Sequence, residues 1–164
     1  MKVTGAVLRL AAAEVLSLFI NMTFAGAGSL LIRIICLICT VMILVAVIMD
    51  FSIRAAKNDA RSSGNIRYKS LVCSAVVVTI FPLLSWIILF ISANNGAFNY
   101  YGIHKLLNAP FLHFYNLIEP SASVSKLGKV EIFAMLPPAF APATVLTIVY
   151  VAAFRRFSTN IDRF

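Results

Sequence analysis

Charged side chains are scarce in this sequence, and their scarcity indicates the class of protein. Only 12% of the 164 residues are charged, whereas 61% are apolar, and the mean hydropathy is +0.94. A soluble domain carries about twice that share of charge, which keeps its surface in contact with water. A chain so poor in charge must place apolar surface against lipid. We therefore expect an integral membrane protein, with residues 1–164 forming one domain.

Cysteine and histidine are too few for the sites that they usually build. Cys36, Cys39 and Cys73 lie within or at the edge of apolar runs, which argues against the disulfide framework of a secreted domain. His104 and His113 lack further ligand-type residues that would complete a metal site. The polar segments contain no Ser/His/Asp set, phosphate-binding loop or paired carboxylates. We predict no metal, no cofactor and no catalytic residue.

Acidic residues are also rare, with 6 Asp and Glu against 14 Lys and Arg, for a net charge of +8. In a soluble protein such an excess would suggest a nucleic-acid partner. Here the basic residues flank the apolar runs, as they do in membrane proteins. We therefore expect no nucleic acid as partner, and attraction to the anionic headgroups of the lipid bilayer instead.

Four apolar runs are long enough to cross a membrane as helices. Hydrocarbon about 30 Å thick requires about 20 mainly apolar residues in a helix. The predicted spans cover approximately residues 6–25, 30–49, 71–93 and 132–154. The first two are separated only by residues 26–29, which predicts a tight antiparallel hairpin. The predicted fold class is all-α, a polytopic bundle of four transmembrane helices.

The positions of lysine and arginine predict the orientation of this bundle. If the N-terminus, a loop at 51–70 and the tail 155–164 share one side, ten basic residues gather there. The other side, which holds the loop 94–131, keeps three. An excess of Lys and Arg marks the cytoplasm. We therefore expect a multi-pass protein of the cell membrane with both termini cytoplasmic. The ten are Lys2, Arg9, Arg54, Lys57, Arg61, Arg67, Lys69, Arg155, Arg156 and Arg163; the three are Lys105, Lys126 and Lys129.

The first segment allows two other interpretations. Lys2 and Arg9 precede an apolar run that ends in residues 25–27, Ala-Gly-Ala, a pattern typical of a cleaved secretory signal. Glu14 falls inside that run and argues against a signal. The segment could also lie flat on the membrane and leave three spans, but its apolar residues surround the helix too evenly. We favour a spanning helix.

The predicted outer loop, residues 94–131, combines aromatic residues with a helical pattern. Apolar residues recur at helical spacing from Ile103 to Ile118, and Pro110 interrupts them. This predicts one or two short helices lying in the outer interface, where the aromatic side chains would sit at headgroup level. We favour a cap on the bundle; a gate or a binding lid is the alternative. The aromatic residues are Phe98, Tyr100, Tyr101, Phe111, Phe114 and Tyr115.

Glu14 is the most informative single residue. An ionisable group inside a span costs about 2.5–3.5 kcal/mol on insertion scales, so it normally faces protein or water and has a partner. Arg33 on the next helix is the natural candidate, although it lies roughly 10 Å nearer to the outer surface. Arg9 and Ser17 are other candidates. Glu14 either exchanges a proton for a cationic substrate or is a structural or interfacial carboxyl, and we favour the latter.

Small multidrug transporters also place a glutamate in the first of four short helices, and Ala13-Glu14-Val15 resembles that arrangement over a few residues. The resemblance implies proton-coupled transport through Glu14. This chain departs from the pattern in its greater length, its outer loop and its proline-rich last helix.

Two further features lie within the predicted spans. Cys36 and Cys39 are separated by two residues on a helix, the spacing that four-helix membrane redox enzymes use to pass electrons to a quinone. Pro82, in the third span, and three prolines in the fourth remove backbone donors and can kink the helices. Such kinks could open a cavity between the third and fourth helices or shape the bundle for a partner. Alternatively, the adjacent pair of prolines indicates that the fourth span is short and starts later, near Ala139. The three prolines are Pro137, Pro138 and Pro142.

Three functional hypotheses follow from the sequence. We favour a small accessory or scaffold subunit that packs against a membrane-protein partner or another copy of itself, because the polar segments are short and lack catalytic sets. The alternative is an oligomeric transporter or channel that uses Glu14. A second alternative is a membrane thiol or quinone oxidoreductase that uses Cys36 and Cys39.

Overall fold

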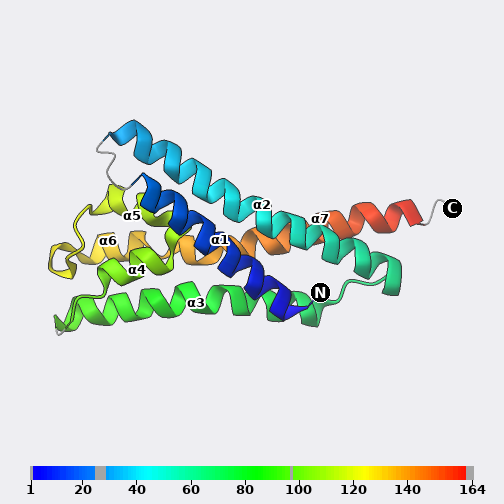
Figure 1. Cartoon of the computed structure of the whole chain (residues 1–164). Helices are drawn as coiled ribbons and strands as arrows, with labels where there is room; N and C mark the ends of the chain where they lie inside the picture. Colours follow the sequence, from blue (N-terminus) through cyan, green and yellow to red (C-terminus); the bar gives the residue numbers. More distant parts are fainter. Residues whose placement is uncertain (1, 25–28, 97, 162–164) are drawn as a thin grey trace.

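The computed structural model describes residues 2–24, 29–96 and 98–161. Helix accounts for 86% of these residues, and none of them lies in a strand. Four helical segments are long and apolar enough to cross a membrane (Figure 1). The predicted fold class is therefore confirmed: the chain is an all-α, multi-pass membrane protein.

The helices form an elongated bundle with two different ends (Figure 1). The N-terminus of α1 (Val3–Thr23), the connection from α2 (Leu30–Ser63) to α3 (Tyr68–Asn95) and the C-terminal end of α7 (Ala141–Ile161) lie at one end. We call this the basic end. The short elements within residues 98–134 lie at the other, which we call the cap end.

Helices α1 and α2 are antiparallel neighbours, as the short link between them predicts. Of that link, residues 25–28 lie outside the described residues. The 21 residues of α1 give a helix about 32 Å long, which matches the hydrocarbon thickness. Its buried face carries small or polar side chains and lets neighbouring helices approach closely. That face consists of Ala6, Leu10, Ala13, Ser17 and Asn21.

Helix α2 is much longer than the predicted span, and most of the predicted loop 51–70 is helical. Its 34 residues extend about 51 Å, so roughly 20 Å lies beyond the hydrocarbon at the basic end. Buried alanines on this extension explain why the charged sequence stays helical. The turn comes later, at Gly64, whose φ of 63° is in the left-handed region that glycine adopts without strain. The buried alanines are Ala55, Ala56 and Ala60.

The half of the bundle nearer to the basic end is filled by apolar side chains from α1, α2, α3 and α7. A buried hydrogen bond lies beside this core: the hydroxyl of Tyr150 donates to Oδ2 of Asp59 at 2.8 Å. The guanidinium Nε of Arg67 lies 3.6 Å from Oδ1 of the same carboxylate. The largest buried aliphatic members of the core are Leu10, Leu44, Ile48, Leu71, Val78 and Leu146.

The fourth span, predicted at approximately 132–154, is interrupted, and its long helix begins only after the Pro137–Pro138 pair. It consists of α6 (Lys129–Ala134), the 3₁₀ turn η3 (Pro137–Phe140) and α7. The prolines occupy first-turn positions, where a missing N–H breaks no helical hydrogen bond. They begin new helical turns and do not kink a continuous helix. These prolines are Pro137, Pro138 and Pro142.

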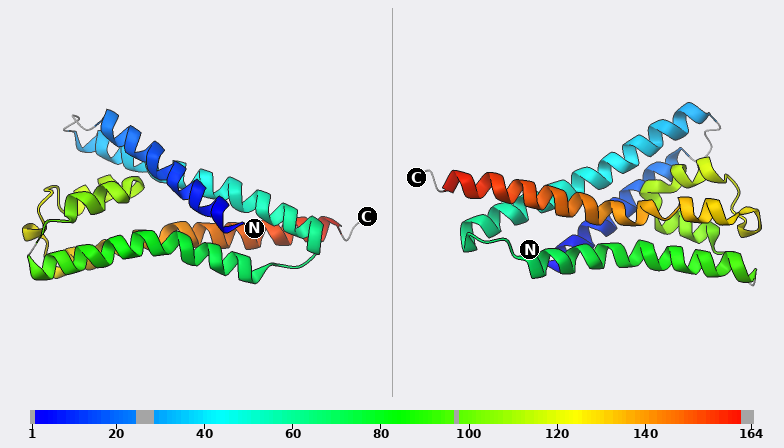
Figure 2. Two further views of the ribbon diagram at one scale, coloured as in Figure 1. Left: turned by 60° about the horizontal axis from the view of Figure 1, so that its bottom comes forward. Right: turned by 180° about the vertical axis from the view of Figure 1, so that it is seen from behind.

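Pro82 is the one proline inside a described long helix. It is buried in the middle of α3, which curves gently in the left view of Figure 2. A proline at this position removes one backbone hydrogen bond and permits such curvature. A hollow of about 280 Å³ lies between α3 and η3, with Phe140 and Ala143 on its far side.

The segment 101–118 differs most from the prediction. It was expected to lie flat in the interface, but α4 (Tyr101–Leu107) runs from the cap end into the bundle (Figures 1 and 2). The chain turns at η1 (Ala109–Phe111), and α5 (Leu112–Ile118) returns toward the cap end. We call this segment the re-entrant hairpin. Its turn contacts both α1 and α2, while α4 packs on α3 and α5 on α2.

The hairpin has its polar face inward and its apolar face outward, the reverse of a helix in a soluble protein. His104, Lys105 and Asn108 are at most 6% exposed. Leu106 and Leu107, which lie between them in sequence, are more than half exposed. Outward apolar residues are typical of contact with lipid, so this pattern places the hairpin within the apolar part of the bundle.

Candidate functional site

The turn of the re-entrant hairpin is held by three side chains from α1 and α2. The backbone N–H of Ala109 donates to Oε2 of Glu14 at 2.9 Å. The side-chain amide of Asn21 donates to the carbonyl oxygen of Ala109 at 2.7 Å. The hydroxyl of Thr40 lies 2.8 Å from the carbonyl of Pro110 and 2.9 Å from that of Cys36. We call Glu14, Asn21 and Thr40 the hairpin anchor.

The chemistry of the anchor follows from its place inside the bundle. The backbone leaves helical geometry at the turn, so its N–H and C=O groups lose their helical partners, and no bulk water is available there. Glu14 and Asn21 are seven residues apart, which is two helical turns, so both face the hairpin from one side of α1. Thr40 projects from the buried face of α2. Each side chain satisfies a group that would otherwise cost free energy.

The partner of Glu14 is thus a backbone amide. It is not Arg33, the candidate that the sequence suggests. Arg33 belongs to the first turn of α2 near the cap end, where it lines a small cavity with His113. Arg9, another candidate, is exposed. Ser17 is buried one turn from Glu14, but its Oγ has no partner among the described residues. Arg33 does not pair with Glu14 because it lies roughly 10 Å nearer to the outer end of the bundle, as the sequence predicts.

A second polar cluster fixes α4 against α3. Oγ of Ser85 lies 2.9 Å from Nδ1 of His104, and the amide of Asn108 donates to the carbonyl of His104 at 2.9 Å. The ring of His104 also packs on Tyr115, with 5.0 Å between their centres. Nε2 of His104 is buried without a partner in the described part of the chain.

The outer end of the hairpin is held by Lys105. Its ammonium donates to Oδ1 of Asn116 at 2.7 Å, to the carbonyl of Glu119 at 2.8 Å and to that of Ser121 at 2.7 Å. It also lies 4.2 Å from the ring centre of Tyr101, a cation–π distance. The Ser121 N–H donates to the Glu119 carboxylate and lowers the pKa of that exposed group. These contacts hold the short elements within residues 98–134, which we call the cap, in one arrangement.

Two of the aromatic residues predicted at headgroup level, Tyr101 and Tyr115, have their side chains inside the protein. Tyr101 and Tyr115 are almost completely buried inside the cap, and the hydroxyl of Tyr101 donates to the carbonyls of Tyr115 and Glu119. Tyr100 is partly buried near Ser85, at 3.4 Å between the two hydroxyl oxygens. The hydroxyl of Tyr101 thus satisfies two backbone carbonyls of the cap end, and the hydroxyl of Tyr100 lies against α3.

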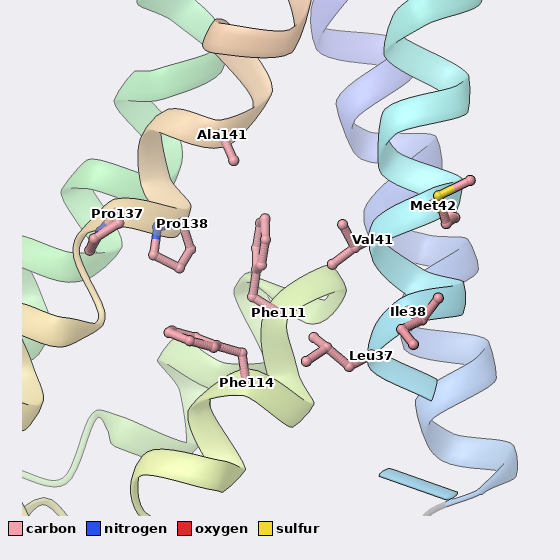
Figure 3. A pocket seen from close by; sticks show the side chains of 9 residues that line it. All are labelled: Leu37, Ile38, Val41, Met42, Phe111, Phe114, Pro137, Pro138 and Ala141. Atoms are coloured by element: carbon pink, nitrogen blue, oxygen red, sulfur yellow. The ribbon is translucent and has the colours of Figure 1, made fainter. Parts of the chain in front are cut away.

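Phe111 and Phe114 project into an apolar groove of about 580 Å³ (Figure 3). The groove separates α2 from η3 and the start of α7, with Leu37 and Val41 on one wall and Pro138 on the other. Only hydrocarbon suits this lining, because it offers almost no hydrogen-bonding group. The prolines therefore shape an apolar surface and not a polar path.

Comparison with known protein families, curated proteins and solved structures finds no match to this chain. The function must therefore be argued from the geometry of the chain itself.

The cysteine pair on α2 does not share one environment. Cys36 is 3% exposed, whereas Cys39 is exposed, because residues three apart on a helix differ in direction by about 60°. Cys73 is also exposed, and all three are free thiols. No group of three His, Cys, Asp or Glu residues in the described chain could hold a metal ion.

The anchor residues Asn21 and Thr40 were missed at the sequence level. The available signal was an amide at a buried position within an apolar helix, two turns from Glu14 on the same face. The sequence could not indicate what the three anchor side chains bind, since their partners are backbone groups 70 to 95 residues away in the chain.

Proposed function

We propose that this protein is a small accessory or scaffold subunit of a membrane complex. It would pack against a membrane-protein partner, or against another copy of itself, and present the fixed cap to that partner. The observation that carries this proposal is the use of Glu14 as a hydrogen-bond acceptor for Ala109 of the hairpin. The ionisable group inside the bundle has a structural task there.

The packing beyond the anchor supports the same conclusion. One turn from Glu14 toward the basic end lies Leu10, and one turn from Thr40 lies Leu44; both are buried in the apolar core. In the described bundle, the buried polar side chains of the half nearer to the cap end are therefore followed, beyond the anchor, by a layer of leucines. A scaffold needs no polar path across the membrane, whereas a transporter or channel needs one in at least one of its states.

The cap has the properties of a docking element. Lys105 and Tyr101 fix it internally through the hydrogen bonds described above, so binding would cost little conformational entropy. Its lipid-facing side exposes Ile103, Leu106 and Leu107 in one patch on α4. In a bilayer such a patch packs equally well against lipid or an apolar helix, so packing shape and polar contacts would select the partner.

We also propose that both termini are cytoplasmic. Among the described residues, nine lysines and arginines lie in or next to the parts of α1, α2, α3 and α7 that are nearer to the basic end, and Arg163 follows α7 in the sequence. Arg33, Lys105, Lys126 and Lys129 belong to the cap end. The excess at the basic end marks it as the cytoplasmic side. Labelling cysteines placed singly at Ser62 and Ser125 with a membrane-impermeant maleimide in intact cells tests this: only position 125 should react.

The proposal is tested by native mass spectrometry of the tagged protein, released gently from its own membrane. We expect a complex of defined stoichiometry that contains at least one other protein, or a defined oligomer of this chain. A hairpin variant that retains the four spans, Lys105→Met, should lose the complex, whereas Lys57→Met at the basic end should retain it. A monomer with no protein bound, under conditions that preserve known complexes of that membrane, would contradict the proposal.

A transporter is the second candidate, because several buried polar atoms near the anchor lack partners among the described residues. They are Oγ of Ser17, Oδ1 of Asn21 and Nε2 of His104. Such atoms can bind water or a small polar solute. This candidate predicts pH-dependent flux in proteoliposomes that Glu14→Gln abolishes, because glutamine cannot exchange a proton. The scaffold proposal predicts that Glu14→Gln leaves assembly almost unchanged, because glutamine still offers an oxygen to Ala109.

A further inference from the structure

A cavity of about 230 Å³ lies at the cap end between α1, α2 and the two arms of the re-entrant hairpin. Its polar lining consists of Asn21, Arg33, His113 and Asn116, and its remaining walls are mainly apolar. At about 30 Å³ for each molecule, it has room for seven or eight waters, or for one compact polar group. We call it the cap-end cavity.

Its lining offers hydrogen-bond capacity that the described residues leave unused. His113 is only 7% exposed, yet neither ring nitrogen has a partner in the described chain. Oδ1 of Asn116 accepts from Lys105, so the NH₂ group of that amide is free to donate to a ligand. A buried imidazole without a partner is costly unless something else binds it.

The charge of the cavity is positive. Arg33 is partly buried, forms no ion pair with any described carboxylate, and lies close enough to His113 to interact with it electrostatically. None of the side chains that line the cavity is acidic. A guanidinium presents paired donors that fit the oxygens of a phosphate, and it is more weakly hydrated than an ammonium.

From these observations we infer that the cap-end cavity binds one phosphate group, which Arg33 pairs with and His113 and Asn116 hydrogen-bond. The group comes either from the headgroup of a membrane phospholipid or from free phosphate. The position of Arg33 in the first turn of α2 sets the site at the level of the lipid headgroups. The unpartnered Oδ1 of Asn21 would accept a hydrogen bond from a headgroup hydroxyl such as that of phosphatidylglycerol. This site is independent of the proposed scaffold function.

The test uses the full-length protein, delipidated in detergent. Native mass spectrometry measures binding of phosphatidylglycerol and of diacylglycerol with the same acyl chains, and thermal unfolding measures stabilisation by inorganic phosphate. Arg33→Gln removes the charge. Asn116→Asp keeps an oxygen for Lys105, and so preserves the fold of the cap, but introduces a negative charge into the cavity. Arg9→Gln is the matched control, because it changes the same charge at an exposed position on α1.

We expect phosphatidylglycerol to bind at one molecule per chain, and about tenfold or more tightly than diacylglycerol. Arg33→Gln and Asn116→Asp should remove that preference, and Arg9→Gln should retain it. If inorganic phosphate stabilises the protein and phosphatidylglycerol binds no better than diacylglycerol, free phosphate is the source. Unchanged lipid preference in both cavity variants would overturn the inference. So would equal binding of both lipids together with no stabilisation by phosphate.

Discussion

Replacing Glu14 by leucine and by glutamine separates the anchoring role of this residue from any role that depends on its proton. The hydrogen bond from Ala109 to Glu14 has one oxygen as acceptor, at 2.9 Å. Leucine removes that oxygen at similar volume and leaves the N–H of Ala109 without a partner. Glutamine keeps an acceptor oxygen and removes only the ionisable proton.

The structure allows the size of each effect to be worked out. A buried backbone N–H without a partner costs about 1–3 kcal/mol, so Glu14→Leu should lower the free energy of hairpin undocking by that amount. At about 1.4 kcal/mol for each factor of ten, this corresponds to roughly 5- to 140-fold more frequent opening. Glutamine still offers an oxygen to this N–H, so Glu14→Gln leaves no buried donor without a partner and should increase opening by only about fivefold or less.

The assay is hydrogen exchange followed by mass spectrometry on peptides that cover residues 101–118, with the protein in lipid nanodiscs. Local opening governs exchange there, so the rates report docking of the hairpin and not overall stability. Ser17→Ala is the matched control: it lies on the same buried face of α1, and its hydroxyl binds nothing in the described chain. It should leave exchange unchanged. Equal effects of leucine and glutamine at position 14, or no effect of either, would refute the anchoring role.

Three further predictions concern other contacts. Thr40→Val removes the donor to the hairpin turn at similar volume and should raise exchange in residues 101–118 about fivefold, because a neutral hydrogen bond contributes about 1 kcal/mol. Lys105→Met leaves three acceptors at the cap without their donor and should lower the free energy of unfolding in detergent by at least about 2 kcal/mol, measured by circular dichroism; a change within about 0.5 kcal/mol would contradict this. Tyr150→Phe removes the buried donor to Asp59 and should cost about 1–3 kcal/mol in the same assay while leaving hairpin exchange unchanged, since sites that share no partner contribute additively.

The four spans were predictable from the sequence because lipid imposes a length and a composition on any helix that crosses it. The ends of the helices were not. Helix α2 continues through residues that resemble a polar loop, because Arg54 and Arg61 are exposed while alanines on the other side pack in the bundle. A prediction based on bilayer thickness therefore places the end of such a helix too early.

The re-entrant hairpin was missed for a different reason. A helix in the headgroup region and a helix inserted beside other helices both have one apolar and one polar face, so Ile103, Leu106 and Leu107 fit either arrangement. The choice depends on whether the polar face meets water or protein. That is settled by Glu14, Asn21 and Thr40, whose partners are backbone groups that no side-chain pattern encodes.

The most direct test of this account is the depth of the hairpin turn in the bilayer. Spin labels are placed singly at Leu107, near the turn, and at Leu117, near the outer end of α5, in a background without cysteine; both positions are exposed. A third label at Val15, beside Glu14 on the exposed face of α1, gives the reference depth. Relative collision rates with oxygen and with a water-soluble nickel complex then report depth. We expect Leu107 to approach the depth of Val15 and Leu117 to lie closer to the headgroups; equal, shallow depths for Leu107 and Leu117 would contradict a hairpin inserted into the bundle.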